Sequence, residues 1–339
     1  MTFVGICIAK AKKHHLVPKC YLKAWSVNKN SVLCFNARGL NPCVEPLNLK
    51  NSFFENNFHT IRPGMLGFKD YKDLILDKIK GYEVYLNDER IAEDLIWNYA
   101  SEINNWVFVK NGIPLCGKDE RTIKQTLSMV RDTSIEENWS EDFENDWQNL
   151  KDLIVRWAQS EHKPLILPFN LGKLIQVIVA MDWRGLNQNQ QLNESFDSTW
   201  NLLIGLLGKD ATNHVQELDK DRNEFKHSIL LKQYLAYFEG RGCIAKQIDL
   251  YCKLHAKFIY SERGELFTSD NPSFFDSEKH IHFFPVSPFV GVELFQSNDG
   301  IKSNWSFREA DKNDISLFND AVKRNAVAKV ILPPSYGNN

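Results

Sequence analysis

The chain has 339 residues, which is enough for one large domain or two ordinary ones. Hydrophobic residues make up 43% of it and charged residues 25%, the proportions of an ordinary globular protein. The net charge of −2 excludes a surface that is basic throughout, so any nucleic-acid site must be a local basic patch.

Cysteine usage and the first residues bear on the compartment. The seven cysteines are odd in number and include no Cys-x-x-Cys pair, which speaks against a disulfide framework and a zinc ribbon. Scattered thiols are typical of a reducing compartment. The apolar run within residues 1–13 is too short for a membrane span and has no basic segment before it. We therefore expect a cytoplasmic protein with no membrane contact, whose first strand lies in residues 1–13.

Taken in chain order, the hydrophobic spacing predicts strands near both ends and helices between them. The segment SVLCFNARG predicts a strand that ends in a turn, and an aromatic-rich segment, NSFFENNFHT, follows it. Strands are also predicted over 243–262 and 280–297, and a last helix over 313–331 with Asn313 or Asp314 as its cap. Apolar residues at three-to-four spacing predict helices over 72–87, 89–109, 118–132, 136–160, 171–188 and 221–239.

These elements indicate an α+β fold: a mostly helical middle, with a mixed or antiparallel sheet built from the N- and C-terminal segments. The N-terminal segment (1–65) is expected to pack on a C-terminal part of strands and a final helix (241–339), with a helical region (66–240) between them. One continuous domain is the alternative. One stripe of the 136–160 helix is expected in the core: Trp139, Phe143, Trp147, Leu150, Ile154 and Trp157.

The first candidate site is the step His14-His15, followed by Pro18. Adjacent imidazoles can titrate or bind metal near neutral pH. The step looks like the start of an HNH nuclease motif, which needs an Asn and a second His on a following helix. Prolines interrupt the segment before Asn51, Asn56, Asn57 and His59, so a local HNH motif is poorly supported. The alternative is a chain entry, in which a helix begins after Pro18 and buries Tyr21, Leu22 and Trp25.

The second candidate is the pair Arg222 and His227 in the segment RNEFKH. HEPN ribonucleases carry an Arg and a His at this spacing on one helix. There the His acts as base or acid, and the cation steadies the phosphate that the 2′-OH attacks. A solvated helix start with ordinary charge pairs is the alternative.

Three further segments carry polar groups. Ser269-Asp270-Asn271-Pro272 is a turn signal at a strand end, where it is either a structural turn or a way to present acids at a cleft. Asp182 and Arg184 end an apolar helix and should meet a buried partner or a pocket. His280 and His282 would lie on the same side of a strand, as metal ligands would.

Several of these stretches together resemble the uncharacterised bacterial family catalogued as domain of unknown function 4238. The resemblance covers both ends well and the helical middle poorly, and it implies no activity. The matching positions are His14, His15, Pro18, Tyr21, Leu22 and Trp25, the segment NSFFENNFHT with His59 in place of Tyr, Arg184, Ser269 to Pro272, Pro285, Ser287, Pro288, Asn319 and Ala326.

The distinctive positions are polar and lie at the two ends of the chain, so we expect the two ends to fold together around one cleft. Two functions stay open. One is a nuclease, acting on RNA rather than DNA, in bacterial defence or as a toxin-like effector. The other is a non-catalytic sensor subunit that binds a ligand or a protein partner. A structural role for the polar motifs is a third alternative, and homodimer formation stays open.

In the nuclease, His14 or His15 would be base or acid, Arg184 would hold phosphate, and Asp270 would orient a histidine or bind a divalent metal such as Mg²⁺. Whether a metal is needed is left open by the sequence. Arg222 and His227 could line the same cleft. The residues expected to bind the substrate are Tyr21, Ser269, Asn271 and Asn319.

Overall fold

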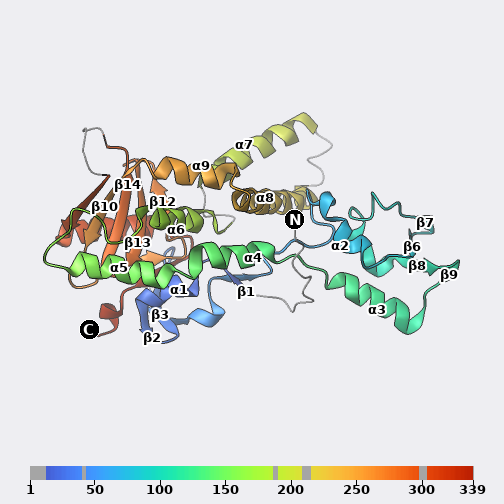
Figure 1. The fold of residues 1–339 in the computed structure, drawn as a ribbon, viewed down its shortest axis with the longest axis horizontal. Coiled ribbons are helices and arrows are strands. Elements are labelled where there is room, and N and C mark those ends of the chain that lie inside the picture. Colours follow the sequence, from blue (N-terminus) through green and yellow to red (C-terminus); the bar gives the residue numbers. More distant parts are fainter. Residues whose placement is uncertain (1–12, 40–42, 186–189, 208–214, 298–303, 339) are drawn as a thin grey trace. The chain divides into compact units, whose positions relative to one another are not determined.

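The computed structural model describes residues 13–39, 43–185, 190–207, 215–297 and 304–338 (Figure 1). It confirms the α+β fold, with helices and mixed or antiparallel sheets. The strand predicted within residues 1–13 lies almost wholly outside the described residues. The chain divides into two compact units. Unit 1 contains residues 56–137 and 198–235, and unit 2 contains residues 14–55, 138–197 and 236–339.

The larger sheet of unit 2 is built from the last third of the chain. Its strand order is β12-β13-β14-β10-β15, in which β15 runs parallel to β10 and the other neighbours are antiparallel. The sheet is therefore mixed, as the sequence predicted for the C-terminal segment. Its strands are β10 (His255–Tyr260), β12 (Phe274–Asp276), β13 (Ile281–Ser287), β14 (Val290–Phe295) and β15 (Trp305–Glu309).

The second sheet of unit 2 joins the two ends of the chain. Its order is β11-β16-β3-β2, with β4 paired to β3, and all pairs are antiparallel. The pairing of β3 with β16 sets Leu33 opposite Leu332. This confirms that N- and C-terminal segments share a sheet. Its strands are β2 (Ser26–Asn28), β3 (Ser31–Asn36), β4 (Glu45–Asn48), β11 (Thr268–Ser269) and β16 (Lys329–Leu332).

Alternating residues of these strands enter two separate cores. Phe258 and Phe284 belong to the core that holds α5, whereas their neighbours Ile259 and Phe283 belong to the core that holds α10. This period of two is what a sheet covered on both faces requires. The helices of unit 2 are α1 (Lys19–Leu22), α5 (Trp147–Gln159), α6 (Leu171–Trp183), α9 (Gly242–Tyr251) and α10 (Lys312–Asn325).

Close packing of α10 on the sheet depends on a glycine, Gly291, which has no side chain. A Cβ atom on Gly291 of β14 would lie 2.6 Å from the ring of Phe318. The ring therefore fits only against a glycine. All six aromatic and aliphatic residues predicted as the core stripe of the 136–160 helix are buried. Four of them, in α5, belong to the core on the other face of the sheet: Trp147, Leu150, Ile154 and Trp157.

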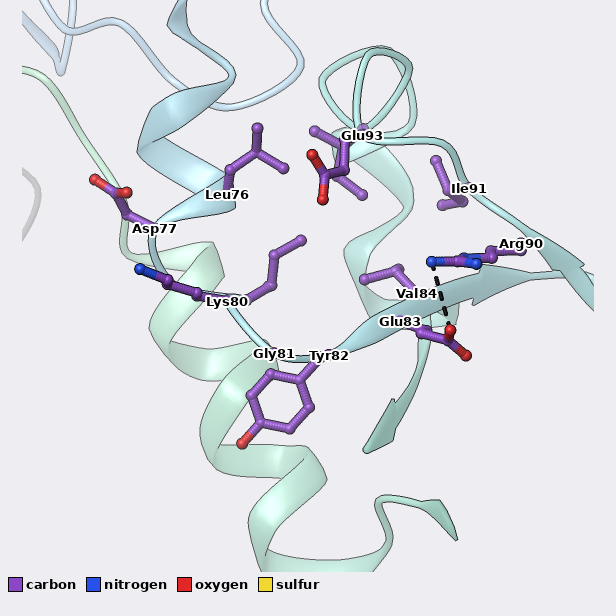
Figure 2. A pocket seen from close by; sticks show the side chains of 12 residues that line it. Leu76, Asp77, Lys80, Gly81, Tyr82, Glu83, Val84, Arg90, Ile91 and Glu93 are labelled. Carbon is purple, nitrogen blue, oxygen red and sulfur yellow. Dashed lines mark ion pairs between the residues drawn. The ribbon is translucent and has the colours of Figure 1, made fainter. Parts of the chain in front are cut away.

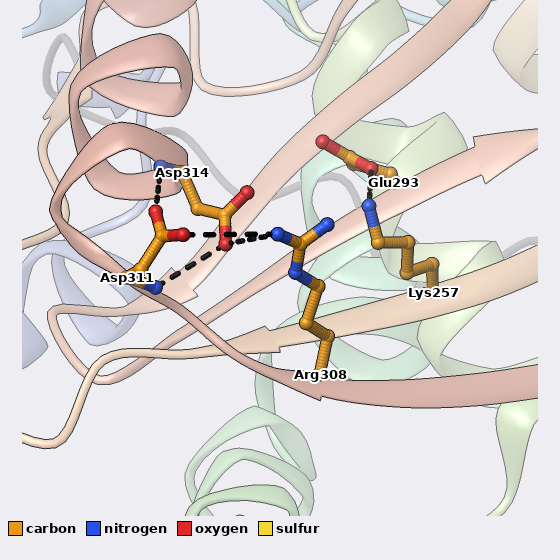
Figure 3. Close-up of polar contacts among 5 residues, drawn as sticks. All are labelled: Lys257, Glu293, Arg308, Asp311 and Asp314. Atoms are coloured by element: carbon orange, nitrogen blue, oxygen red, sulfur yellow. Dashed lines mark hydrogen bonds and ion pairs between the residues drawn. The ribbon is translucent and has the colours of Figure 1, made fainter.

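Ion pairs fix the start of α10 against the larger sheet (Figure 3). Asp311 caps α10 and forms a capping box with Asp314. Arg308 of β15 reaches Asp314 at 2.9 Å, and Lys257 of β10 reaches Glu293 of β14 at 3.0 Å. Asp311 is the cap in place of the predicted Asn313 or Asp314.

Unit 1 combines a small sheet with short helices. The strand order is β7-β6-β8-β9, and all pairs are antiparallel. Two hairpins with two-residue turns build it: Asn87-Asp88 and Asn111-Gly112, all four residues with positive φ. The elements of unit 1 are α2 (Asp73–Leu76), β6 (Glu83–Leu86), β7 (Glu89–Arg90), β8 (Val107–Lys110), β9 (Ile113–Pro114) and α3 (Gly117–Ser128).

Four predicted elements are wrong at least in part. The helices expected over 72–87 and 89–109 are mainly the strands and turns of unit 1. The first half of the strand expected over 243–262 is helix α9, and the helix expected over 313–331 ends at Asn325, before β16. The remaining elements are β1 (Lys13–His15), β5 (Phe54–Asn56), α4 (Ser134–Trp139), α7 (Gln190–Leu207) and α8 (Val215–Phe238).

Candidate functional site

Arg184 lies buried in unit 2, at the end of α6. Its side chain is 1% exposed, and its Nη2 lies 2.7 Å from Oε1 of Glu144. Its Nε donates to the backbone oxygen of His15 at 2.6 Å, and the guanidinium lies 5.0 Å from the ring centre of Trp139. The structure thus brings Arg184 to the histidine step, through the His15 backbone. Glu144, which balances the buried charge, was not singled out in the sequence.

The histidine step is a short strand at the entry to the core of unit 2. β1 pairs with β5, and Nδ1 of His15 donates to the backbone oxygen of Ser52 at 3.1 Å. The His15 ring contacts that of Phe54, and His14 is buried. Helix α1 begins directly after Pro18, as predicted. The stretch therefore serves as a chain entry, and the chemistry predicted for its imidazoles stays a prediction.

Tyr21 ties this N-terminal helix to the C-terminal strands. Its hydroxyl donates to the backbone oxygen of Pro285 at 2.8 Å and accepts from the Thr268 hydroxyl at 2.6 Å. Burial raises the pKa of Tyr21 well above its ordinary value. Nearby, Nε1 of Trp25 donates to the backbone oxygen of Leu266 at 2.9 Å. These bonds satisfy buried polar groups and connect positions more than 240 residues apart.

The Ser269–Pro272 turn anchors the end of α10 and the start of β16. The carboxylate of Asp270 accepts from the backbone N–H groups of residues 327, 328 and 329, at 2.7 to 3.0 Å. Burial raises the pKa of Asp270, and these three bonds oppose that shift. The Ser269 hydroxyl bonds within the turn to Asn271, whose Nδ2 donates to the backbone oxygen of Asn325 at 3.1 Å.

Asn319 makes a similar tie from the middle of α10. Its Oδ1 accepts from the backbone N–H of Phe267 at 2.8 Å, and its Nδ2 donates to the backbone oxygen of Glu265 at 2.9 Å. Tyr21, Ser269, Asn271 and Asn319, the residues predicted to bind substrate, thus all bond to other parts of unit 2. Their predicted role in binding stays a prediction. The contacts of Asp270 and those of Arg184 involve different residues.

Arg222 and His227 lie on α8, in unit 1, five residues apart. Nε2 of His227 donates to the backbone oxygen of Phe58 at 2.7 Å, and the two rings stack with centres 4.6 Å apart. The pKa of His227 falls to about 4, mainly because of burial, with smaller contributions from the neighbouring His59 and Arg62. Its ring is therefore neutral at pH 7. This favours a positioning role for His227 over proton transfer.

His59, the residue after Phe58, forms a close polar pair with Glu136 in unit 1. Nδ1 of His59 lies 2.5 Å from Oε2 of Glu136 on α4. The His59 ring is buried and makes an edge contact with Tyr234 at 5.3 Å. A carboxylate on Nδ1 orients the ring and strengthens the basicity of Nε2. His59 was considered only as the distant half of an HNH motif, and Glu136 was not considered.

A cavity of about 270 Å³ opens in unit 1 beside β6 (Figure 2). Ile79, Val84 and Ile96 contribute buried apolar side chains to it. Charged groups surround them, and two of these, Glu83 and Arg90, form an exposed ion pair at 3.4 Å. Polar and charged groups make up more of its accessible lining than apolar groups do, so the cavity suits a small polar molecule. No pattern in the sequence indicates it.

Asp182 and His282 belong to buried polar contacts of unit 2. Asp182 accepts from Nε2 of Gln247 at 3.0 Å, and burial raises its pKa to about 7. His282 lies between the Tyr251 hydroxyl at 3.1 Å and the Ser273 hydroxyl at 2.7 Å, and burial lowers its pKa to about 3. His280 and His282 do not lie together as half-exposed residues of one strand, as predicted: His282 is buried in β13, whereas His280 sits in an exposed turn with φ of 54° before the strand begins.

Comparison with known proteins places this chain. The pattern of the family described as "Protein of unknown function (DUF4238)" matches residues 13–335. The chain belongs to this family. The match confirms the resemblance seen at the two ends and extends it across the middle. No curated protein and no solved structure matches this DUF4238 chain. Within the residues described, helices of the length and apolarity needed to span a bilayer are absent.

Proposed function

We propose that this DUF4238 protein is a nuclease that cleaves RNA by acid–base chemistry, centred on His59 and Glu136 of unit 1. The distance of 2.5 Å between Nδ1 of His59 and Oε2 of Glu136 carries the proposal. When the carboxylate accepts a hydrogen bond from Nδ1–H, the neutral ring holds its lone pair on Nε2. That nitrogen is then oriented and more basic, as a general base requires.

The scheme balances without further reagents. His59 accepts the proton of a ribose 2′-OH, the 2′ oxygen bonds to phosphorus, and the bond from phosphorus to the 5′ oxygen breaks. The leaving 5′ oxygen takes up a proton from water, His59 returns its proton to the solvent, and the products are a 2′,3′-cyclic phosphate and a 5′-OH. Glu136 stabilises the imidazolium that forms. Because His59 is buried, its ring must be uncovered when RNA binds. DNA lacks the 2′-OH and is not cut by this route.

His227 enters this scheme as a positioning residue. Its neutral ring holds the backbone oxygen of Phe58, and the next residue is the proposed base. The catalytic roles of His14, His15, Arg184, Asp270 and Arg222 remain predictions from the sequence, as does a metal such as Mg²⁺. A role as a defence or toxin-like effector belongs to the same proposal.

The alternative is a sensor that binds a ligand without chemistry. The cavity of unit 1 favours it, because a lining of charged groups around a few buried apolar side chains suits a small polar molecule (Figure 2). In that protein, replacing His59 would leave ligand binding at the cavity unchanged.

The deciding experiment incubates the full chain with labelled RNA and with DNA of the same sequence, in Mg²⁺ and in EDTA. We expect RNA to be cut in both, with cyclic phosphate ends, and DNA to stay intact. His59→Ala should slow cleavage by about 10²–10⁴-fold, the usual contribution of a general base. Glu136→Gln should slow it less. His162→Ala is the matched control, because His162 lies in an exposed loop.

Two outcomes reject the proposal: RNA left intact by the wild-type protein, or RNA cut equally by the His59→Ala variant. Cleavage that needs Mg²⁺ and includes DNA would reject the acid–base scheme. A His14→Ala/His15→Ala variant tests the histidine step in the same assay. Growth arrest on expression in bacteria, abolished by His59→Ala, would support the effector role.

A further inference from the structure

Two arginines face each other across an isolated backbone bridge in unit 1. Ile61 and Asp132 form an antiparallel bridge and exchange both backbone hydrogen bonds, each at 3.1 Å. In such a pair the next residue on one side lies opposite the preceding residue on the other. Arg62 therefore lies opposite Arg131, and side chains at such positions project to the same face.

This arrangement places two positive charges together without an acidic partner. Like charges directly opposite each other are destabilising. Burial, and then the charge of Arg62, lower the pKa of Arg131. Within the described ranges, neither Arg62 nor Arg131 forms an ion pair with a carboxylate. The arginines that do form such pairs are Arg90, Arg184, Arg241, Arg308 and Arg324. Arg131 instead donates from Nη1 to its neighbour, the backbone oxygen of Val130, at 2.5 Å.

The surrounding groups suit an anion. Two acidic residues that follow Arg131 in the sequence already have contacts. Asp132 accepts from the backbone N–H of Ser134 at 2.9 Å, and Glu136 pairs with His59. On the other side of the bridge, the hydroxyl of Thr60 is buried and has no hydrogen-bond partner in the part of the chain that the structure describes. An anion can accept from two guanidinium groups and a hydroxyl at once.

We propose that Arg62 and Arg131 form a binding site for a phosphate group. A tetrahedral phosphate matches the planar donor fork of arginine and removes the repulsion between the two cations. A phosphodiester of RNA as the natural occupant rests on the proposed function. Arg62 lies three residues after His59, and its charge acts on His227, so the site adjoins the proposed base. Phosphate binding itself does not depend on cleavage.

The first test measures the melting temperature of the full chain in inorganic phosphate and in chloride of equal ionic strength. Wild-type protein should melt at a higher temperature in phosphate, because a ligand that binds the native state stabilises it. In chloride, Arg62→Gln should melt no lower than wild type, because the substitution removes a repulsion. In phosphate, this variant should gain no stability. Arg121→Gln is the matched control, because Arg121 is an exposed arginine of unit 1 on α3, outside the cavity and the bridge.

The second test uses a 2′-O-methyl RNA oligonucleotide, which cannot be cleaved through its 2′ position. Arg62→Gln and Arg131→Gln should each weaken binding about tenfold and lower the salt dependence by about 0.7 per lost phosphate contact. Arg121→Gln should change neither the binding nor its salt dependence. His59→Ala should bind as wild type, so loss of cleavage and loss of phosphate binding are separate results.

Three outcomes overturn the site: no phosphate-specific gain in melting temperature, unchanged binding and salt dependence in both arginine variants, or an equal loss in Arg121→Gln. Arg62 is exposed, so its variant is expected to fold even if Arg131→Gln does not. A protein that binds phosphate here and leaves RNA intact would keep the site and reject the nuclease.

Discussion

Replacing Arg184 by methionine tests whether this residue holds unit 2 together. The substitution keeps the length of the side chain and removes its charge. It leaves the carboxylate of Glu144 and the backbone oxygen of His15 without the donors that now lie at 2.7 and 2.6 Å. Breaking a buried ion pair from one side costs about 3–5 kcal/mol of unfolding free energy. Because the Glu144 side chain is 24% exposed, we expect the lower part of this range.

Urea denaturation followed by tryptophan fluorescence gives the unfolding free energy of Arg184→Met, Glu144→Gln and the double variant. The double variant should be more stable than the sum of the single losses predicts, by about 0.5–3 kcal/mol, because the two residues interact. Arg241→Met is the control: its ion pair with Glu239 is exposed, so its loss should cost less than about 1 kcal/mol. A cost below about 1 kcal/mol for Arg184→Met, or strict additivity, would refute the reasoning.

Three further predictions concern unit 2. Tyr21→Phe should lower the unfolding free energy by about 1–3 kcal/mol in urea denaturation, because the Pro285 oxygen loses its donor; a neutral result would contradict the hydrogen bonds. Gly291→Ala should cost about 1–3 kcal/mol by the same measurement, because its methyl group meets the Phe318 ring, and wild-type stability would show that α10 can shift. In the native state the pKa of Asp182 is raised to about 7, so its contribution to stability is lost as pH rises from about 4 to 7. The unfolding free energy of Asp182→Asn relative to that of wild type should therefore increase over this pH range. A difference that stays constant with pH would contradict the prediction.

Secondary structure was predicted most accurately where one hydrophobic period extends over a long segment. The burial of the 136–160 stripe was predicted correctly, because apolar residues at three-to-four spacing mark one face of a helical segment. The segment is not one continuous helix, because π-helical residues Ser140–Glu144 separate α4 from α5. The small sheet of unit 1 was missed because its strands are short and its apolar residues fit a helical spacing. The signal was present in the turns: Asn111-Gly112 is a strong hairpin dipeptide, and Asn87-Asp88 is another pair that tolerates positive φ.

The residues of the candidate site could be predicted from the sequence only in part, for a different reason. Arg184 and the histidine step stood out because polar residues interrupt apolar segments there. Their contacts with Glu144 and Ser52, like the pairing of His59 with Glu136 across 77 positions, follow from tertiary packing. Likewise, the final helix ends early because Asp270 draws the backbone of residues 327–329 into its own bonds, which no local pattern of the helix reveals.

The pairing of β3 with β16 sets the order of events during synthesis. β16 lies between β11 and β3 in its sheet, and it consists of residues 329–332. This sheet cannot close until those residues have been synthesised, long after β3 (residues 31–36), so one edge of β3 stays unpaired during that interval. Contacts between such distant segments slow folding. An exposed strand edge also invites pairing with other chains. A nascent chain that stalls before residue 329 would therefore be prone to aggregate, even though almost all of its core residues have been made.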